Sequence, residues 1–209
     1  MAKKKILLFS CIPFIIFTIL IKTIDLGIVG LTNKKVGFSY LNSLFYKESV
    51  NEAWKNISNV FLVISIILIL LVGIYGIIQF FKQKKIDKDI IIFCIFIILL
   101  MIIWILFDKV IIINYRPIYV DGQLEGSYPS THALVLSFVN LVFAYLINKR
   151  FNNQKFMLIT NIISYIFIII GVVSRLLSGY HWFTDIIGGI LLGISFYCYY
   201  IYFDNKRKL

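Results

Sequence analysis

The sequence predicts an all-α, polytopic membrane protein with six transmembrane helices, and three observations support this fold class. Of the 209 residues, 60% are hydrophobic and only 15% are charged. The mean hydropathy of +0.91 is far above that of a chain that folds around one core in water. The apolar residues gather into six runs, each near the roughly 20 residues that cross a bilayer. The segments outside these runs contain almost all of the charged residues, as loops between spans require.

The six apolar runs are expected to form the spans in chain order. The first follows three lysines and resembles a signal peptide, but no small-residue cleavage site follows it, so we interpret it as an uncleaved helix. No repeat or low-complexity linker divides residues 1–209, which we interpret as a single integral-membrane domain. In the last run, Gly189 and Gly193 predict close packing against another helix. The spans are placed at residues 6–21, 60–81, 90–107, 133–147, 157–173 and 183–203.

The longest connection, residues 22–59, contains apolar residues at helix-like spacing. Tyr40, Leu41 and Leu44 form one such group, and Trp54 and Ile57 belong to a second. The pattern predicts one or two short interfacial helices in this first outer loop, with an ordinary loop as the alternative.

The distribution of charge predicts the orientation of the spans. Placing residues 1–5, 82–89, 148–156 and 204–209 inside gives that side 13 of the 21 basic residues and three acidic ones. The outer segments then hold eight basic and seven acidic residues. The positive-inside rule therefore predicts that both termini are cytoplasmic. This asymmetry accounts for the net charge of +11 without a nucleic-acid partner.

A first polar cluster follows the third span. Lys109 and Arg116 lie seven residues apart, with Pro117 next, and on one helix face they would neutralise a phosphate together. The alternative is a pair of basic side chains that reach the interface from the end of the helix.

A second cluster, Tyr128 to His132, opens the fourth span. Ser130 is placed as the N-cap, so that the free backbone N–H groups of Thr131 and His132 face an anion. A histidine there suits proton transfer. An ordinary capped helix is the alternative.

A third cluster joins the fifth and sixth spans and contains Arg175, His181 and Asp185. Because His181 and Asp185 are four residues apart at a helix start, they are expected to form a hydrogen bond that orients the imidazole as a nucleophile. A capped helix end with one buried ion pair is the alternative. Two histidines and one carboxylate make a poor metal site, so no metal is expected.

All three clusters lie at the outer ends of the predicted spans, and together they indicate a site more strongly than each does alone. They contain both histidines of the chain and two of its four arginines. Such a cationic layer would bind phosphate, while the apolar helices below it would hold a lipid tail.

The three motifs, K-x6-R-P, P-S-x-H and S-R-x5-H-x3-D, occur in this order within residues 109–185. The chain thereby resembles the type 2 phosphatidic acid phosphatase superfamily, the lipid phosphate phosphatases. The resemblance implies that His181 attacks phosphorus, that Asp185 orients it, and that His132 protonates the leaving oxygen and then activates water. It also implies a phosphate site without a metal or cofactor. The implied phosphate ligands are Lys109, Arg116, Ser130, Thr131 and Arg175, and Thr131 departs from the glycine common at its position.

The resemblance implies a metal-independent hydrolase of the bacterial plasma membrane, with its active site at the outer face. Its expected partners are the bilayer and a lipid phosphate. Small bacterial members similar to this chain suggest undecaprenyl diphosphate, converted to undecaprenyl phosphate through a phosphohistidine. Phosphatidylglycerol phosphate and phosphatidic acid are the alternative substrates. A lipid phosphotransferase and a non-catalytic lipid transporter remain as alternatives from other classes.

Overall fold

The computed structural model describes residues 10–151 and 153–206, and these are predominantly helical. Two strands of two residues each, β1 (Gly27–Ile28) and β2 (Lys35–Val36), pair antiparallel. The helical elements are α2 (Ile12–Thr23), α3 (Ser39–Phe45), α4 (Glu52–Gln83), α5 (Lys88–Ile105), the π-helical turn η1 (Leu106–Val110), α6 (Thr131–Phe151), α7 (Gln154–Leu177) and α8 (Phe183–Asn205).

The predicted all-α membrane fold is confirmed. Among the described residues, five helical segments are long and apolar enough to cross a membrane: α4, α5 continued by η1, α6, α7 and α8. The shorter apolar helix α2 covers the second half of the predicted first span. The first residues of that span, 6–9, lie outside the described part of the chain.

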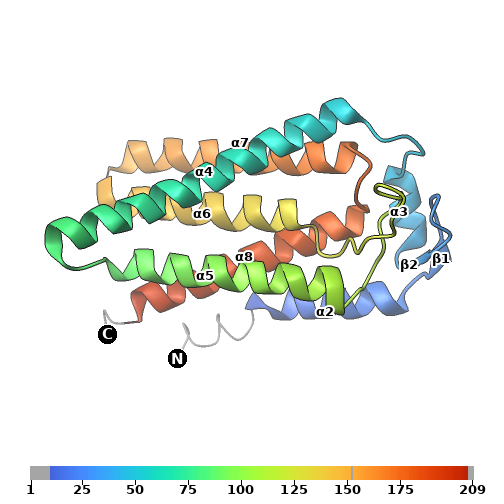
Figure 1. The fold of residues 1–209 in the computed structure, drawn as a ribbon, viewed down its shortest axis with the longest axis horizontal. Helices are drawn as coiled ribbons and strands as arrows, with labels where there is room; N and C mark the ends of the chain where they lie inside the picture. The colour runs from blue at the N-terminus through green and yellow to red at the C-terminus, as the bar shows by residue number, and fades with distance from the viewer. Residues whose placement is uncertain (1–9, 152, 207–209) are drawn as a thin grey trace.

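Helix α6 lies at the centre of the bundle and packs against α4, α5, α7 and α8 (Figure 1). Because protein surrounds most of its surface, it accommodates buried polar side chains, and Asn140 donates to Ser65 Oγ at 3.1 Å. The predicted close approach at the two glycines of α8 is confirmed. A Cβ placed at Gly193 would lie 2.7 Å from Ser137 Cβ, and one at Gly189 would lie 2.8 Å from Ala133 Cβ.

The first outer loop differs in part from the prediction. Residues 39–45 form the expected short helix, α3. The preceding residues form the β1–β2 hairpin, which was not predicted because these residues show no alternating apolar pattern. Trp54 and Ile57 belong to the first turns of α4, so the loop contains one of the one or two short helices predicted. The Asn51 side chain caps this helix by accepting from Trp54 N at 3.1 Å, which lets α4 begin before its apolar run.

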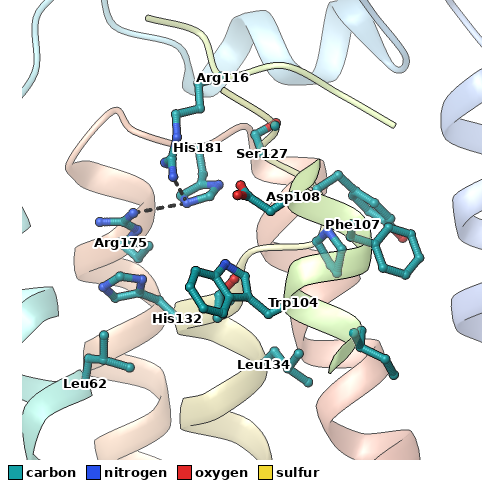
Figure 2. Close-up of a pocket in the computed structure, with 15 residues that line it drawn as sticks. Leu62, Trp104, Phe107, Asp108, Arg116, Ser127, His132, Leu134, Arg175 and His181 are labelled. Carbon is teal, nitrogen blue, oxygen red and sulfur yellow. Dashed lines mark hydrogen bonds between the residues drawn. The ribbon is translucent and has the colours of Figure 1, made fainter. Parts of the chain in front are cut away.

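The loops separate into two groups at opposite ends of the bundle. The connections α4–α5 and α6–α7 lie at one end with the last turn of α8 (Figure 1). The β1–β2 hairpin, α3 and the connections η1–α6 and α7–α8 lie at the other end, part of which Figure 2 enlarges. This alternation places both histidines at one end, as the predicted spans require.

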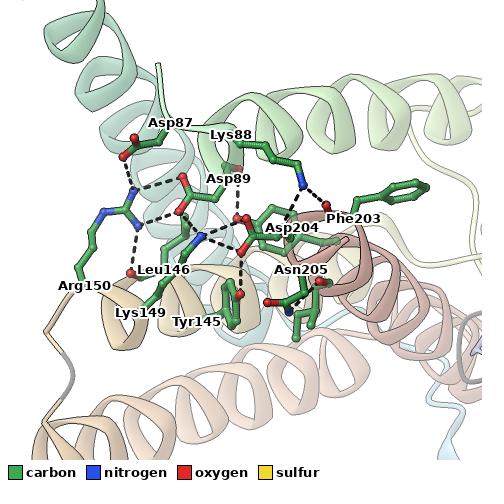
Figure 3. Close-up of polar contacts among 12 residues, drawn as sticks. Asp87, Lys88, Asp89, Tyr145, Leu146, Lys149, Arg150, Phe203, Asp204 and Asn205 are labelled. Carbon is green, nitrogen blue, oxygen red and sulfur yellow. Dashed lines mark hydrogen bonds and ion pairs between the residues drawn. The ribbon is translucent and has the colours of Figure 1, made fainter. Parts of the chain in front are cut away.

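A polar network ties the helices together at the end remote from the histidines (Figure 3). Lys149 Nζ lies 2.9 Å from Asp89 Oδ2 and 2.8 Å from Asp204 Oδ2, and so joins α5, α6 and α8. Arg150 reaches Asp89, and the Tyr145 hydroxyl donates to Asp204 at 2.7 Å. Both aspartates are almost fully buried, so loss of the lysine would leave Asp89 paired with Arg150 alone and would remove the cation that contacts the Asp204 carboxylate. We interpret the network as structural.

Candidate active site

The three predicted clusters meet around one cavity of about 270 Å³ at the histidine end of the bundle (Figure 2). Leu62, Ile103, Trp104 and Phe107 from α4, α5 and η1 form an apolar wall, together with Leu134 of α6. The polar lining consists of Asp108, Arg116, Ser127, Thr131, His132, Arg175 and His181.

His181 lies in the short turn between α7 and α8. Gly179 permits this turn, because its φ of +78° is a conformation that other residues rarely adopt. On the other side of His181, the Trp182 indole donates to the carbonyl of Tyr115 at 2.7 Å and ties the turn to the η1–α6 connection. The turn therefore holds the imidazole against the cavity, and His181 as a whole is only 7% exposed.

Two guanidinium groups converge on one atom of His181. Arg116 Nη1 and Arg175 Nη2 each lie 3.1 Å from Nε2 (Figure 2). Because guanidinium groups only donate, Nε2 accepts both hydrogen bonds and the ring proton resides on Nδ1. Burial, followed by the charges of Arg116 and Arg175, lowers the pKa of His181 well below its usual value. The unprotonated Nε2 therefore faces a site that suits an anion.

Asp185 lies behind His181 and connects all three clusters. Its Oδ2 is 3.6 Å from His181 Nδ1, so the predicted partners are adjacent but beyond hydrogen-bond distance. The same Oδ2 accepts from Trp182 N at 3.0 Å, and Oδ1 accepts from Asn114 Nδ2 at 3.1 Å. The backbone carbonyl of Asp185 accepts from Ser130 N at 2.9 Å. A small closure would complete the His181–Asp185 bond, as is common when a substrate binds.

The two arginines are held by different partners. Arg116 Nε donates to Glu125 Oε2 at 2.9 Å, and its Nη1 also contacts the Tyr180 carbonyl. Arg175 is 6% exposed, and its guanidinium carbon lies 5.4 Å from the centre of the Tyr180 ring. Both cations are thus positioned by side chains or backbone outside the anion site.

The start of α6 supplies the remaining predicted residues. Ser130 is fully buried, and its Oγ lies 3.5 Å from Ala133 N, at the limit of the expected capping bond. Thr131 and His132 line the cavity, whereas Ser130 lies behind it. His132 Nε2 lies 3.2 Å from Asn59 Oδ1, and since an amide oxygen only accepts, this nitrogen carries a proton.

Lys109, like Ser130 and Asp185, does not line the cavity. Its side chain is 70% exposed, and Nζ lies 2.9 Å from Asp108 Oδ2. The prediction that Lys109 and Arg116 share one helix face is wrong, since the helix ends at Val110 and Arg116 lies in the irregular connection to α6. Of the predicted residues, Arg116, Thr131, His132, Arg175 and His181 come together around the cavity.

Among the polar residues of this region that escaped sequence reasoning are Asn59, Asp108 and Asn114. Asn114 is 3% exposed and lies between apolar residues and a motif arginine, which is a weak signal of a buried partner. Asn59 belongs to α4, far from the motifs in sequence, and nothing local predicts its contact with His132. Within the described ranges, no group of three or more His, Cys, Asp and Glu residues is placed to hold a metal ion.

Comparisons with known proteins found one matching family model and one crystal structure of similar fold. Residues 110–209 match the model of the PAP2 superfamily, and this region contains both histidines, Asp185 and the two cavity arginines. A crystal structure described as the first transmembrane PAP2 type phosphatidylglycerolphosphate phosphatase from Bacillus subtilis has a similar fold, with a TM-score of 0.67. The two chains are 23% identical, and the match covers 96% of each. No curated protein sequence matches the chain significantly.

Proposed function

We propose, from the match of residues 110–209 to the model of the PAP2 superfamily, that this chain is a membrane lipid phosphatase. One observation carries the proposal: Nε2 of His181 lies 3.1 Å from a nitrogen of each cavity guanidinium. A phosphoryl group bound between Arg116 and Arg175 would place its phosphorus next to an unprotonated ring nitrogen. The apolar wall of the same cavity provides a surface for a lipid tail.

The reaction that we propose has two steps. In the first, a bond forms between Nε2 of His181 and phosphorus while the bond from phosphorus to the leaving oxygen breaks. Protonated His132 gives its proton to that oxygen, and Asp185 stabilises the positive charge on the His181 ring through Nδ1–H. In the second step, His132 accepts a proton from water as the water oxygen attacks phosphorus. Orthophosphate leaves, and His181 regains its lone pair.

The arginines would bind the non-bridging oxygens and stabilise the charge of both transition states. Thr131 and the start of α6 would provide donors on the other side of the phosphoryl group. The N-cap Ser130 would act through the helix start that it holds. Lys109 would contribute only from outside the cavity, after leaving Asp108.

The substrate is tested by a panel of lipid phosphates. Undecaprenyl diphosphate is the substrate first predicted from the sequence, with phosphatidylglycerol phosphate and phosphatidic acid as the alternatives. The structure similar in fold is described as a phosphatidylglycerolphosphate phosphatase, which supports including that lipid. An acceptor alcohol in parallel assays distinguishes hydrolysis from phosphotransfer, and a non-catalytic transporter would release no phosphate from any lipid.

Because side-chain cations surround the phosphoryl site, we expect phosphate release from the preferred lipid to persist in EDTA. The measurement is released orthophosphate from the purified protein, before and after chelation. A metal-dependent phosphatase assayed in parallel should lose its activity and so verify chelation. Loss of all release in EDTA, with recovery on adding back a divalent cation, would contradict the proposed mechanism.

We further propose that the cavity lies at the outer face of a bacterial plasma membrane and that both termini are cytoplasmic. The support is the excess of basic residues at the opposite end of the bundle. A cysteine in place of exposed Gln123 should react with a membrane-impermeant maleimide in intact cells, and one in place of Lys155 only after permeabilisation. The unsubstituted chain measures labelling of its three native cysteines. The reverse pattern would invert the orientation.

A further inference from the structure

The cavity contains one carboxylate that has no part in the proposed reaction, that of Asp108. It lies in η1, directly after the apolar wall residue Phe107. Figure 2 shows its side chain projecting towards the cavity, between His181 and Trp104. The side chain is 18% exposed, and among the described residues its one ion-pair partner is Lys109, which is 70% exposed. Because Lys109 does not line the cavity, the carboxylate is the member of this pair that a bound substrate would meet.

Asp108 lies where the group that joins the phosphoryl group to the tail of a bound lipid phosphate would pass. The reacting phosphoryl group would lie at Arg116, Arg175 and His181, and the tail would lie along Trp104 and Phe107. The group that connects phosphoryl to tail must pass between these two regions, beside Asp108. In a lipid diphosphate this group is a second phosphate, whereas in a phosphomonoester it is the carbon chain of an alcohol.

The charges of the lining distinguish these two cases. The histidines aside, the two guanidinium groups and one carboxylate of the lining give a net charge of one positive. A phosphomonoester carries about −1.5 to −2 at neutral pH, and the second phosphate of a diphosphate adds negative charge next to the carboxylate. Two like charges a few ångströms apart in a partly dehydrated site repel strongly. A hydroxyl group in the same place would instead donate to the carboxylate.

We propose that Asp108 determines the substrate class of this site. It favours phosphomonoesters whose alcohol carries hydroxyl groups, and it disfavours diphosphates. This inference rests on the proposed function, and it ranks a glycerol-linked phosphomonoester above the lipid diphosphate predicted from the sequence. Asp108 acts as a specificity residue, since it neither attacks phosphorus nor transfers a proton.

The test compares a monophosphate and a diphosphate on the same isoprenoid tail. Substitution Asp108→Asn, which keeps the shape and removes the charge, should raise the ratio of kcat/KM for diphosphate over monophosphate by about tenfold. Asp121→Asn is the matched control: Asp121 is exposed in the η1–α6 connection and does not line the cavity, so its loss should leave the ratio unchanged. Asp108→Ser is a second variant should the first fail to fold.

Binding of inorganic anions tests the role of Asp108 without relying on phosphatase activity. Calorimetry gives the affinities of orthophosphate and inorganic diphosphate without turnover, and Asp108→Asn should tighten diphosphate relative to orthophosphate by a similar factor. Absence of phosphate release from every lipid would reject the phosphatase function, while the two affinities would still decide the role of Asp108. An unchanged ratio in both Asp108 variants, or the same change in Asp121→Asn, would overturn the inference.

Discussion

Substitution His181→Asn is expected to lower kcat for the preferred lipid phosphate by about 10⁴-fold or more, the range found when a nucleophile is removed from an enzyme that forms a covalent intermediate. Asparagine keeps a polar side chain near Arg116 and Arg175 but lacks the nitrogen lone pair that attacks phosphorus. The measurement is single-turnover release of orthophosphate.

The control for this substitution is binding without chemistry. Because both guanidinium groups remain, His181→Asn should still be stabilised against thermal unfolding by orthophosphate. Near-normal turnover by a variant that keeps this stabilisation would remove His181 from the nucleophile role.

Substitution Arg175→Gln is expected to lower kcat/KM by about 10² to 10³-fold, the usual loss when one preorganised donor to a developing charge is removed. Its guanidinium is buried and contacts the attacking nitrogen, so it would stabilise the phosphoryl oxygens without reorganising. Steady-state kinetics of the purified variant measure the effect.

Lys55 provides a matched control for Arg175, because its Nζ also lies over the Tyr180 ring, at 5.0 Å from the centre. Lys55 does not line the cavity, so Lys55→Gln removes the same charge beside the same ring with little effect on kcat/KM. An equal loss of kcat/KM in both variants would show that the effect of Arg175→Gln comes from losing a cation beside the Tyr180 ring. It would not then come from losing a donor to the phosphoryl group.

The apolar runs predicted the membrane helices because a bilayer imposes both length and composition on a span. Their ends were less predictable. Helix α4 begins at Glu52, eight residues before its apolar run, because Asn51 caps it and because its first turns pack at the loop end of the bundle. Lys109 lies in the π-helical turn, which ends at Val110, and Arg116 lies beyond that end, which the spacing of the two residues does not reveal.

The candidate site was predictable as far as its motifs extend. His181 and Arg175 lie in one short segment, and the position of both histidines at loop ends follows from the count of spans. The contacts of Asn59 with His132 and of Asn114 with Asp185 depend on which helices pack together, and sequence spacing says little about that. Asp108 lies next to a motif lysine in the sequence, and this position alone suggests an ion pair. Its place in the cavity lining depends on the tertiary structure.

The most direct test of nucleophilic attack by His181 is isolation of the phosphorylated enzyme. An aryl phosphate with a good leaving group needs little protonation, so His132→Asn should still form the intermediate but hydrolyse it slowly. After an alkaline quench and proteolysis, mass spectrometry should locate the phosphoryl group on His181, with one phenol released per enzyme in an initial burst. His132→Asn combined with His181→Asn should show neither. Phosphate release by the unsubstituted enzyme with no burst and no phosphorylated His181 in His132→Asn would contradict the mechanism.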